Sequence, residues 1–315
     1  QRRVDGLSFG AAVFTNLTRD HLDYHVTMDA YRDAKARLIG LLAKGGTAVV
    51  NTDDAAWRAL PHADKTLTFG LNVQSDVSAR NIEYASDGSR FLLVSDGGAV
   101  PVALPLIGEF NLSNALATAA TALALGLPLV DIAQRLESAP QIPGRLEKLR
   151  TEPTVLRDYS HTPDSLERAI IAVRPFAIAI ASASASASAN SNLTAGTLTS
   201  RLIVVFGCGG DRDRGKRSVM GEVAERLADH VILTSDNPRT ENPERILDDI
   251  EAGMKRKDHE RIEDRRQAIA HALEIAQPND VILLAGKGHE TYQIRGTTSH
   301  HFDEKEIVAE LSVAK

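Results

Sequence analysis

Residues 202–217 read LIVVFGCGGDRDRGKR, a run of five apolar residues followed at once by a glycine-rich polar stretch. A helical pattern begins at residue 216, so this segment has the form strand, loop, helix. Apolar runs of the same kind stand at residues 154–156, 231–234 and 281–285, and helical patterns separate them at residues 163–173, 243–254 and 264–275. Strands that alternate with helices in this way predict an α/β fold with a doubly wound parallel sheet.

Polar clusters follow each of these strands directly, at residues 158–164, 207–217, 236–239 and 286–290. In a parallel sheet the carboxyl ends of the strands meet at one edge, which is where open α/β sheets bind ligands. A single cluster could be a turn with a helix cap, but four together are hard to explain as turns. We therefore predict a ligand site at this edge.

The cluster at residues 207–217 has the spacing of a phosphate-binding loop, from Gly210 to Gly215 and Lys216. Arg217, however, stands where a Ser or Thr hydroxyl would meet Mg²⁺, and nearby carboxylates would repel phosphates. We reject a nucleotide loop here. Arginines in a glycine-rich turn suit a carboxylate ligand, since guanidinium binds carboxylate in a bidentate way.

The cluster at residues 236–239 carries both charge signs within four residues, which suits an amino acid with its ammonium and carboxylate groups. It could equally be a turn into a helix with Asn242 as N-cap and Pro243 in its first turn, and both can hold together. His289 and Glu290 could be a metal pair, but no third ligand accompanies them at suitable spacing.

The first half of the chain is less regular. Apolar and helical patterns predict strands at residues 11–15 and 47–51, helices at 27–42, 53–60, 111–125 and 127–138, and short antiparallel strands over 67–104. A Pro/Gly interruption at residues 140–144 predicts a boundary between domains at 1–141 and 142–315. An alanine-serine tract suggests a flexible surface insertion over residues 177–200.

Residues 18–25 read TRDHLDYH and place His21 and His25 four residues apart. A hard-cation site with Asp and one His is favoured over zinc, and a polar loop that starts a helix is the other interpretation. Lys35 lies in the helical pattern that follows, where spacing alone favours a solvated surface lysine.

Composition narrows the class of protein. The 315 residues carry 36 Lys and Arg against 42 Asp and Glu, so the net charge is −6, and aromatic residues make up 4%. This balance argues against a broad nucleic-acid surface. Cys208 is the single cysteine, so no internal disulfide can form, a reducing compartment is expected, and its thiol is interpreted as a small packing group. The sequence contains no stretch of 18 or more apolar residues, so no membrane-spanning helix is predicted.

Together these motifs resemble the Mur ligase family. Residues 13–25, reading VFTNLTRDHLDYH, with Lys35 downstream, are similar to the family's central domain. The four clusters at residues 158–164, 207–217, 236–239 and 286–290 are similar to the C-terminal domain of its diaminopimelate-adding (MurE) type. The resemblance implies an α/β architecture, with a partial central P-loop-type ATPase domain followed by a Rossmann-like doubly wound C-terminal domain.

The resemblance also implies a reaction. ATP would phosphorylate the D-glutamate carboxylate of a UDP-N-acetylmuramoyl dipeptide, and the amine of meso-diaminopimelate would attack the resulting acyl phosphate in peptidoglycan precursor synthesis. Phosphorylation supplies the leaving group that a carboxylate lacks, and positioning and charge stabilisation carry most of such catalysis. ATP and Mg²⁺ are the implied cofactors, and a cytoplasmic monomer that binds no nucleic acid is expected.

Site residues follow from the resemblance position by position. Lys35 matches a catalytic lysine whose carbamate helps to hold Mg²⁺, which requires a neutral amine, and His21 matches a Mg²⁺ ligand. The residues that match nucleotide contacts are Asn111, Asn114, Arg145, Asp158 and His161. Those that match contacts to the UDP-sugar are Gln1 and Arg3. Those that match the amino-acid site are Arg212, Asp236, Asn237, Pro238, Arg239, Gly286 and Glu290. Arg239 would grip the distal carboxylate that diaminopimelate has and lysine lacks.

Two departures from the family pattern affect the expected activity. Neither the family's N-terminal uridine-binding domain nor the G-x-x-G-K-[ST] phosphate loop that opens its central domain occurs in this sequence, which begins with Gln1 and not Met. We therefore expect an N-terminally truncated fragment that is inactive as it stands. A non-catalytic relative used as a scaffold is the alternative, and a folylpolyglutamate-type ligase is a third that the cluster at residues 236–239 disfavours.

Overall fold

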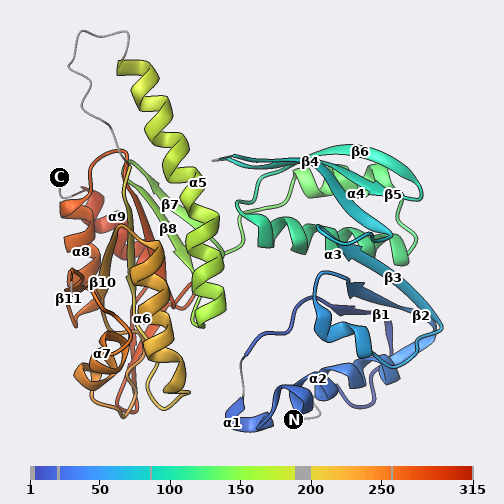
Figure 1. Cartoon of the computed structure of the whole chain (residues 1–315), viewed down its shortest axis with the longest axis horizontal. Coiled ribbons are helices and arrows are strands. Elements are labelled where there is room, and N and C mark those ends of the chain that lie inside the picture. The colour runs from blue at the N-terminus through green and yellow to red at the C-terminus, as the bar shows by residue number, and fades with distance from the viewer. Residues whose placement is uncertain (1–3, 20–21, 86, 189–199, 257, 314–315) are drawn as a thin grey trace. The chain divides into compact units, whose positions relative to one another are not determined.

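The computed structural model describes residues 4–19, 22–85, 87–188, 200–256 and 258–313. The chain divides into two compact units, Gln1–Pro140 and Gln141–Lys315. Each unit has its own sheet and its own helices (Figure 1).

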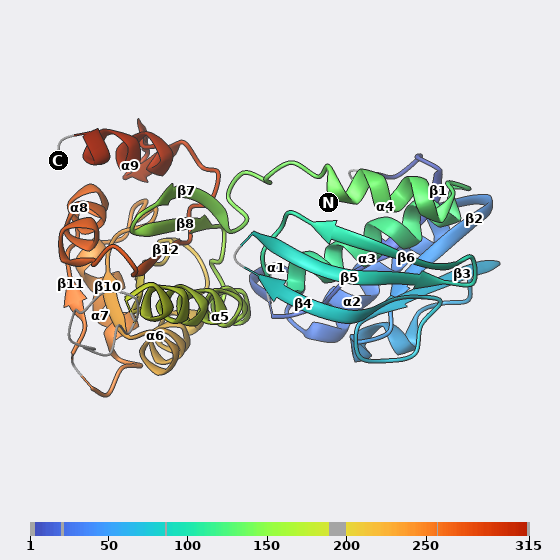
Figure 2. The ribbon, with the colours of Figure 1, turned by 90° about the horizontal axis from the view of Figure 1, so that it is seen from above.

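The first unit is built on a six-stranded sheet in the order β1-β2-β3-β4-β5-β6. Its strands are β1 (Phe9–Phe14), β2 (Leu42–Asn51), β3 (Lys65–Gly70), β4 (Val77–Ala85), β5 (Gly88–Ser95) and β6 (Gly98–Leu104). Its helical elements are α1 (Leu22–His25), α2 (Met28–Ala36), α3 (Glu109–Ala124), α4 (Leu129–Glu137) and the 3₁₀ turns η1 (Arg37–Leu41) and η2 (Ala55–Ala59). Helices α3 and α4 lie against this sheet (Figure 2), where Leu112 and Leu116 are fully buried among Val49, Phe69 and Leu93.

Several expectations for this unit need correction. The antiparallel strands expected over residues 67–104 are found only for β4, β5 and β6, since β3 pairs in parallel with both β2 and β4. The helix expected over residues 27–42 ends at Ala36 and gives way to η1, where Ile39 and Gly40 have low helix propensity. The helix expected over residues 53–60 is the 3₁₀ turn η2.

The second unit has a six-stranded sheet in the order β11-β10-β9-β12-β8-β7. Its strands are β7 (Glu147–Thr151), β8 (Thr154–Asp158), β9 (Leu202–Phe206), β10 (His230–Leu233), β11 (Glu260–Arg261) and β12 (Val281–Ala285), and a hairpin of β13 (Tyr292–Arg295) and β14 (Thr298–His301) follows. All pairs in the sheet are parallel except the edge pair of β7 with β8. The predicted parallel sheet is confirmed, because strands covered on both faces are continuous apolar runs.

Helices cover both faces of the second sheet. They are α5 (Pro163–Ser188), α6 (Gly215–Leu227), α7 (Pro243–Glu251), α8 (Arg265–Ile275) and α9 (Glu304–Val313). Helices α5, α6 and α7 pack in sequence on one face, while α8 and α9 lie together on the other (Figure 2). The two-sided cover is the doubly wound arrangement that the sequence predicts.

The flexible insertion expected over residues 177–200 is wrong for residues 177–188, which belong to helix α5. The helix continues through the alanine-serine tract to Ser188 and extends past the end of the sheet (Figure 1). Alanine has the highest helix propensity, so the tract can prolong a helix that is already nucleated by its packed first turns. Residues 189–199 of the expected insertion lie outside the described residues.

Candidate functional site

The carboxyl ends of the strands in the second sheet bring the polar clusters together, as the sequence predicts. The amide of Gly286, after β12, donates to the carbonyl oxygen of Asp158 at the end of β8 at 3.0 Å. A Cβ at Gly207, after β9, would lie 1.9 Å from the carbonyl oxygen of Thr234, after β10. Only glycine permits this approach, so the four loops share one edge of the sheet. We call the residues that gather there the carboxyl-edge site: Arg212, Asp236, Asn237, Arg239, Gly286, Lys287 and Glu290.

Asp236 and Asn237 lie buried at the centre of the carboxyl-edge site. A Cβ at Gly286 would lie 2.6 Å from Oδ2 of Asp236, so the glycine leaves room for that carboxylate. The carboxamide of Asn237 donates to Oε2 of Glu290 at 2.9 Å. The structure therefore brings together the Asp236, Asn237, Gly286 and Glu290 that the sequence had singled out, and Pro238 is buried beside them.

Arg239 follows these residues in the chain, and its backbone is strained, with a positive φ of 51°. Its amide donates to the carbonyl oxygen of Ile294 at 3.1 Å, and its Nη1 donates to the carbonyl oxygen of Gly210 at 2.8 Å. A Cβ at Gly209 would lie 3.0 Å from Nη1 of Arg239 and 3.8 Å from Cγ of Arg212. The two arginines thus lie over the same glycine, with Arg212 exposed and Arg239 half-buried.

Arg217 and Glu241 form a buried brace beneath these loops. Arg217 is fully buried, and its Nη2 and Nη1 donate to the two carboxylate oxygens of Glu241 at 2.8 and 3.1 Å. Nη1 also donates to Asp249 at 2.8 Å, and Nη2 to the carbonyl oxygen of Gly209 at 3.2 Å. The guanidinium of Arg217 lowers the pKa of Glu241 to about 2. Arg217 therefore holds the loop after β9 rather than a phosphate, in agreement with our rejection of a nucleotide loop.

Asp211 also departs from the geometry of a nucleotide loop. Its carboxylate accepts from the amide of Thr240 at 3.1 Å and from the hydroxyl of Thr240 at 2.9 Å. Lys216 turns toward the neighbouring cluster, where its Nζ donates to the carbonyl oxygen of His161 at 2.8 Å. These side chains connect the loops to one another, which the spacing of their residues did not reveal.

Lys287 is the residue of this site that the sequence analysis missed. Its side chain is fully buried, and its Nζ lies 3.1 Å from Oε2 of Glu290 and 3.2 Å from Oδ1 of Asn237. A lysine is almost never buried without an opposite charge. Its place between two glycines directly after a buried strand was the only signal in the sequence.

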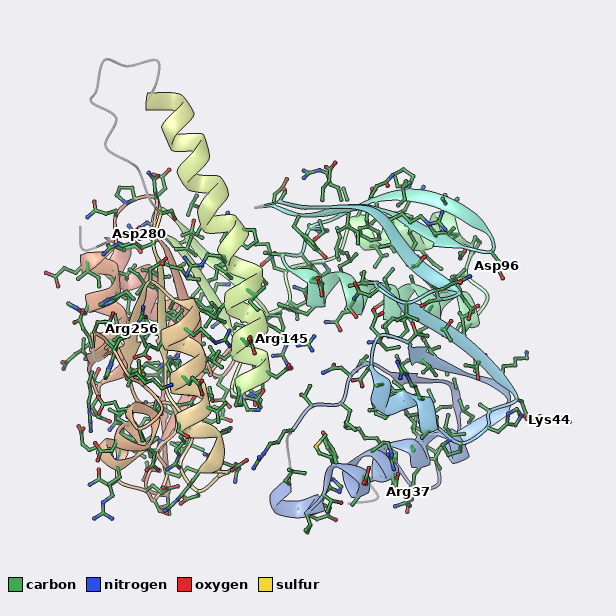
Figure 3. The ribbon with its side chains drawn as sticks, viewed as in Figure 1. Arg37, Lys44, Asp96, Arg145, Arg256 and Asp280 are labelled. Atoms are coloured by element: carbon green, nitrogen blue, oxygen red, sulfur yellow. The ribbon has the colours of Figure 1, made fainter. Side chains whose placement is uncertain are left out.

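An aromatic and cationic group lies beside the loop that follows β12. Tyr159 packs against His161 with ring centroids 4.7 Å apart and against His289 at 5.5 Å, and Arg145 lies 5.0 Å over the ring of Tyr159. Nδ1 of His161 is 2.8 Å from the carbonyl oxygen of Tyr159, which fixes the ring. Arg145 is exposed and can be followed in Figure 3.

Asp158 lies buried beside this group. It accepts from the amide of Leu146 at 2.9 Å, and burial raises the pKa of its carboxyl. Three of the predicted nucleotide residues, Arg145, Asp158 and His161, are therefore neighbours in the second unit. Through this hydrogen bond Asp158 also stabilises the backbone at Leu146, which has a positive φ of 43°.

In the first unit, Lys35 is exposed on α2 and lines a cavity of about 360 Å³. Phe14, Asn16 and Trp57 line the same cavity, and Nζ of Lys35 lies 4.9 Å from the ring centroid of Tyr31. Burial that would favour a neutral amine at Lys35 is not found in this unit by itself.

The other predicted residues of this unit are dispersed. Asn111 is buried and donates to the carbonyl oxygen of Ile107 at 2.8 Å, whereas Asn114 is exposed one turn further along α3. His25 stacks on Tyr31 with ring centroids 4.9 Å apart. Gln1, Arg3 and His21 lie outside the described residues.

Two features are absent from the described residues. No group of three or more His, Cys, Asp and Glu side chains among them could hold a metal ion. No helix in this part of the chain is long and apolar enough to cross a membrane.

Comparison with known families accounts for both units. The model of the Mur ligase middle domain matches residues 1–122, and that of the Mur ligase glutamate ligase domain matches residues 176–288. The chain belongs to the Mur ligase family. This bears out the resemblance seen in the sequence motifs and the two-domain α/β architecture inferred from it.

Individual relatives within the family carry the name of one particular ligase. The chain is 46% identical over 97% of its length to the UDP-N-acetylmuramoyl-L-alanyl-D-glutamate–2,6-diaminopimelate ligase of Synechococcus elongatus, and 45% identical over 97% to that of Thermosynechococcus vestitus. A solved structure of a ligase of the same name is 36% identical, with a TM-score of 0.59 over 99% of this chain and 62% of that one. The chain spans 59% of the length of the two relatives.

Proposed function

We propose that this chain takes part in the ATP-dependent ligation of meso-2,6-diaminopimelate to UDP-N-acetylmuramoyl-L-alanyl-D-glutamate, a cytoplasmic step of peptidoglycan precursor synthesis. The observation that carries this proposal is the carboxyl-edge site. Its two carboxylates, Asp236 and Glu290, and its two arginines, Arg212 and Arg239, suit a ligand with both ammonium and carboxylate groups. The relatives named for the same ligation support the choice of substrate.

The proposed reaction has two steps. The γ-phosphoryl group of ATP passes to the carboxylate of the D-glutamyl residue, which releases ADP and gives an acyl phosphate. The amine of diaminopimelate then attacks the acyl carbon, phosphate leaves, and the nitrogen loses a proton as the amide forms. The protein's share in such a reaction is positioning and charge stabilisation.

Arg239 supports diaminopimelate over lysine as the amino acid. Diaminopimelate carries a distal carboxylate that lysine lacks, and a guanidinium can bind it through two parallel hydrogen bonds. Arg212 lies over the same glycine and adds a second positive charge. Asp236 and Glu290 would take an ammonium group of the same ligand.

The nucleotide and metal contacts remain predictions. Arg145 and the rings of Tyr159 and His161 offer a flat and cationic surface suited to a nucleotide. The described residues do not by themselves fit a Mg²⁺ site, because no cluster of His, Cys, Asp and Glu ligands is found among them. A site formed with His21 and a carbamate on Lys35 is what the family resemblance predicts.

Calorimetry with meso-diaminopimelate, L-lysine and D-glutamate tests the proposal on the full chain. We expect binding of meso-diaminopimelate in preference to the other two. Arg239→Ala should weaken that binding by about 2–3 kcal/mol, as for the loss of a charge-assisted pair. The exposed Arg245 on α7 provides a matched control, and Arg245→Ala should bind like the parent chain.

Two outcomes would contradict the proposal. Equal affinity of the Arg239→Ala variant and the parent would remove the specificity argument. A parent chain that binds none of the three amino acids would favour the alternative of a non-catalytic relative.

A further inference from the structure

Lys287 occupies an unusual position for a lysine. It is the second residue after β12 and is fully buried. The ring centroids of Tyr292 and Phe302 lie 5.6 and 5.8 Å from its Nζ, within the range of a cation–π contact. A buried ammonium is costly unless a carboxylate and further acceptors surround it, so its partners are the reason it is tolerated.

The two carboxylate oxygens of Glu290 have different hydrogen-bond partners. Oε2 lies 3.1 Å from Nζ of Lys287 and 2.9 Å from Nδ2 of Asn237, so it accepts from two buried donors. Oε1 lies 3.5 Å from the hydroxyl of Tyr292, at the limit of a hydrogen bond. The carboxylate is therefore held through one oxygen, which leaves acceptor capacity on the other.

The carboxamide of Asn237 is locked by the same lysine. Its Oδ1 accepts from Nζ of Lys287 at 3.2 Å and from the amide of Ile294 at 2.9 Å, while its Nδ2 donates to Glu290. Two donors on one side and an acceptor on the other determine which way the amide points. Asn237 thus transmits the position of Lys287 to Glu290 and to the hairpin that begins with β13.

We propose that Lys287 is a positioning residue, which holds Glu290 and Asn237 in the geometry that binds an ammonium group of the amino-acid substrate. This inference rests on the proposed function, since it concerns the same site. It assigns Asn237 chiefly to the support of Glu290, and Glu290 to the ligand. Lys287 acts through these two side chains and does not touch the ligand.

The balance of charge supports this arrangement. Asp236 approaches Gly286 closely, so two carboxylates gather at the site, and Lys287 is a fixed cation beside one of them. A ligand ammonium would supply the second cation. Without Lys287, Glu290 would lose its fixed counter-charge and could turn toward solvent or toward the arginines.

A double-mutant cycle on the full chain tests the proposal, with affinity for meso-diaminopimelate measured by calorimetry. Lys287→Met keeps an unbranched apolar side chain about as long as the lysine stem and removes the ammonium. We expect it to weaken binding about tenfold or more, and Glu290→Gln to do the same. Because Lys287 acts through Glu290, the double variant should bind no more weakly than Glu290→Gln alone.

The exposed Lys255 provides the matched control, and Lys255→Met should leave binding unchanged. Thermal unfolding of each variant shows whether a lost affinity accompanies a lost fold. A purely structural role for Lys287 would instead give losses that add in the double variant. Additive losses, or unchanged binding by Lys287→Met, would overturn the proposal while the proposed function stands.

A measurement on the unaltered chain covers the case in which Lys287→Met does not fold. The ammonium of a buried lysine exchanges slowly with water, so its ¹⁵N resonance can be followed by NMR. We expect that resonance to shift when meso-diaminopimelate is added, and to stay in place with pimelate, which has the same carboxylates and no ammonium. An unchanged resonance with saturating meso-diaminopimelate would overturn the positioning role. A parent chain that binds no meso-diaminopimelate would overturn both this inference and the proposed function.

Discussion

Lys35 and Lys287 belong to the candidate sites of the two units, and their surroundings differ completely. Lys35 is exposed beside a cavity, with the ring of Tyr31 at 4.9 Å. Lys287 is fully buried and bonded to Glu290 and Asn237. The polar side chains Asn237, Lys287 and Glu290 of the second unit are hydrogen-bonded to one another, whereas Lys35 in the first unit is exposed. Variants in the two units should therefore differ in their effect on stability.

The largest effect is expected at the brace beneath the carboxyl-edge site. Arg217→Met would leave Glu241 and Asp249 without the guanidinium that joins them, and should lower the free energy of unfolding by about 3–5 kcal/mol. Arg214 is the matched control, because it pairs with the same Glu241 at 2.9 Å but is 70% exposed. Arg214→Met should cost less than about 1 kcal/mol.

Urea unfolding can assign this loss to one unit. Trp57 is the single tryptophan and is buried in the first unit, so its fluorescence follows that unit, while circular dichroism follows both. We expect Arg217→Met to shift the circular-dichroism transition more than the fluorescence transition. Equal shifts in the two signals, or equal losses for Arg217→Met and Arg214→Met, would contradict the difference between the units.

Acid should weaken the same brace. The pKa of Glu241 is lowered from 4.5 to about 2, so the carboxylate stabilises the folded state above about pH 4.5, and that contribution is lost as the pH falls toward 2. Over this range the parent should lose more free energy of unfolding than Glu241→Gln, which has no carboxylate to protonate. Denaturant titrations at several pH values measure the difference. Glu222→Gln, at an exposed position on α6, should follow the parent, and parallel curves for the parent and Glu241→Gln would exclude the brace.

Substitutions at Gly286 and Gly296 can distinguish the effect of a close contact from the effect of backbone strain. Gly286 and Gly296 have positive φ angles of 115° and 61°, but a Cβ at Gly286 would lie 2.6 Å from Oδ2 of Asp236, whereas one at Gly296 would meet no described atom within 4 Å. Gly296→Ala should cost about 1 kcal/mol of stability, and Gly286→Ala about 1–3 kcal/mol. Calorimetry should also show weaker binding of meso-diaminopimelate by Gly286→Ala alone. Identical behaviour of the two variants would mean that Asp236 is not confined.

The smallest effect is expected at Lys35. Its side chain is exposed, so Lys35→Ala should change the free energy of unfolding by less than about 0.5 kcal/mol. Urea unfolding followed by Trp57 fluorescence reports on the unit that contains it. A loss above about 1 kcal/mol would show that Lys35 is already engaged in the folded unit, and the contrast with Lys287 would disappear.

The second unit was predicted well from the sequence for a physical reason. Strands such as β9 and β12 are covered on both faces, so each is a continuous apolar run that stands out from its polar flanks. In the first unit, β3 and β4 alternate like antiparallel strands, and the parallel pairing of β3 depends on partners far along the chain. The start of helix α5 was predicted, but its continuation through the alanine-serine tract was missed, because small residues leave no hydrophobic pattern although alanine favours a helix.

The candidate site shows the same division. Asp236, Asn237, Arg239 and Glu290 could be singled out because polar residues directly after buried strands must meet at one edge of a parallel sheet. Lys287 also follows a buried strand, but a lysine between glycines is typical of an exposed loop, so its burial was not predicted. Its burial depends on Tyr292 and Phe302, which follow it in the chain and fold back over it.

The sequence by itself determined the alternation of strands and helices, the clustering of charged residues at one sheet edge, and the family to which the chain belongs, because apolar runs and local motifs are written in neighbouring residues. Only the tertiary structure decided which of the charged side chains are buried and paired. In the sequence, Arg217 is a charged residue of a helix and Lys287 one of a loop, like many others. Only the folded chain places Glu241 beside Arg217 and Glu290 beside Lys287. Burial and charge pairing depend on distant segments, so they are settled only when the sheet brings those segments together.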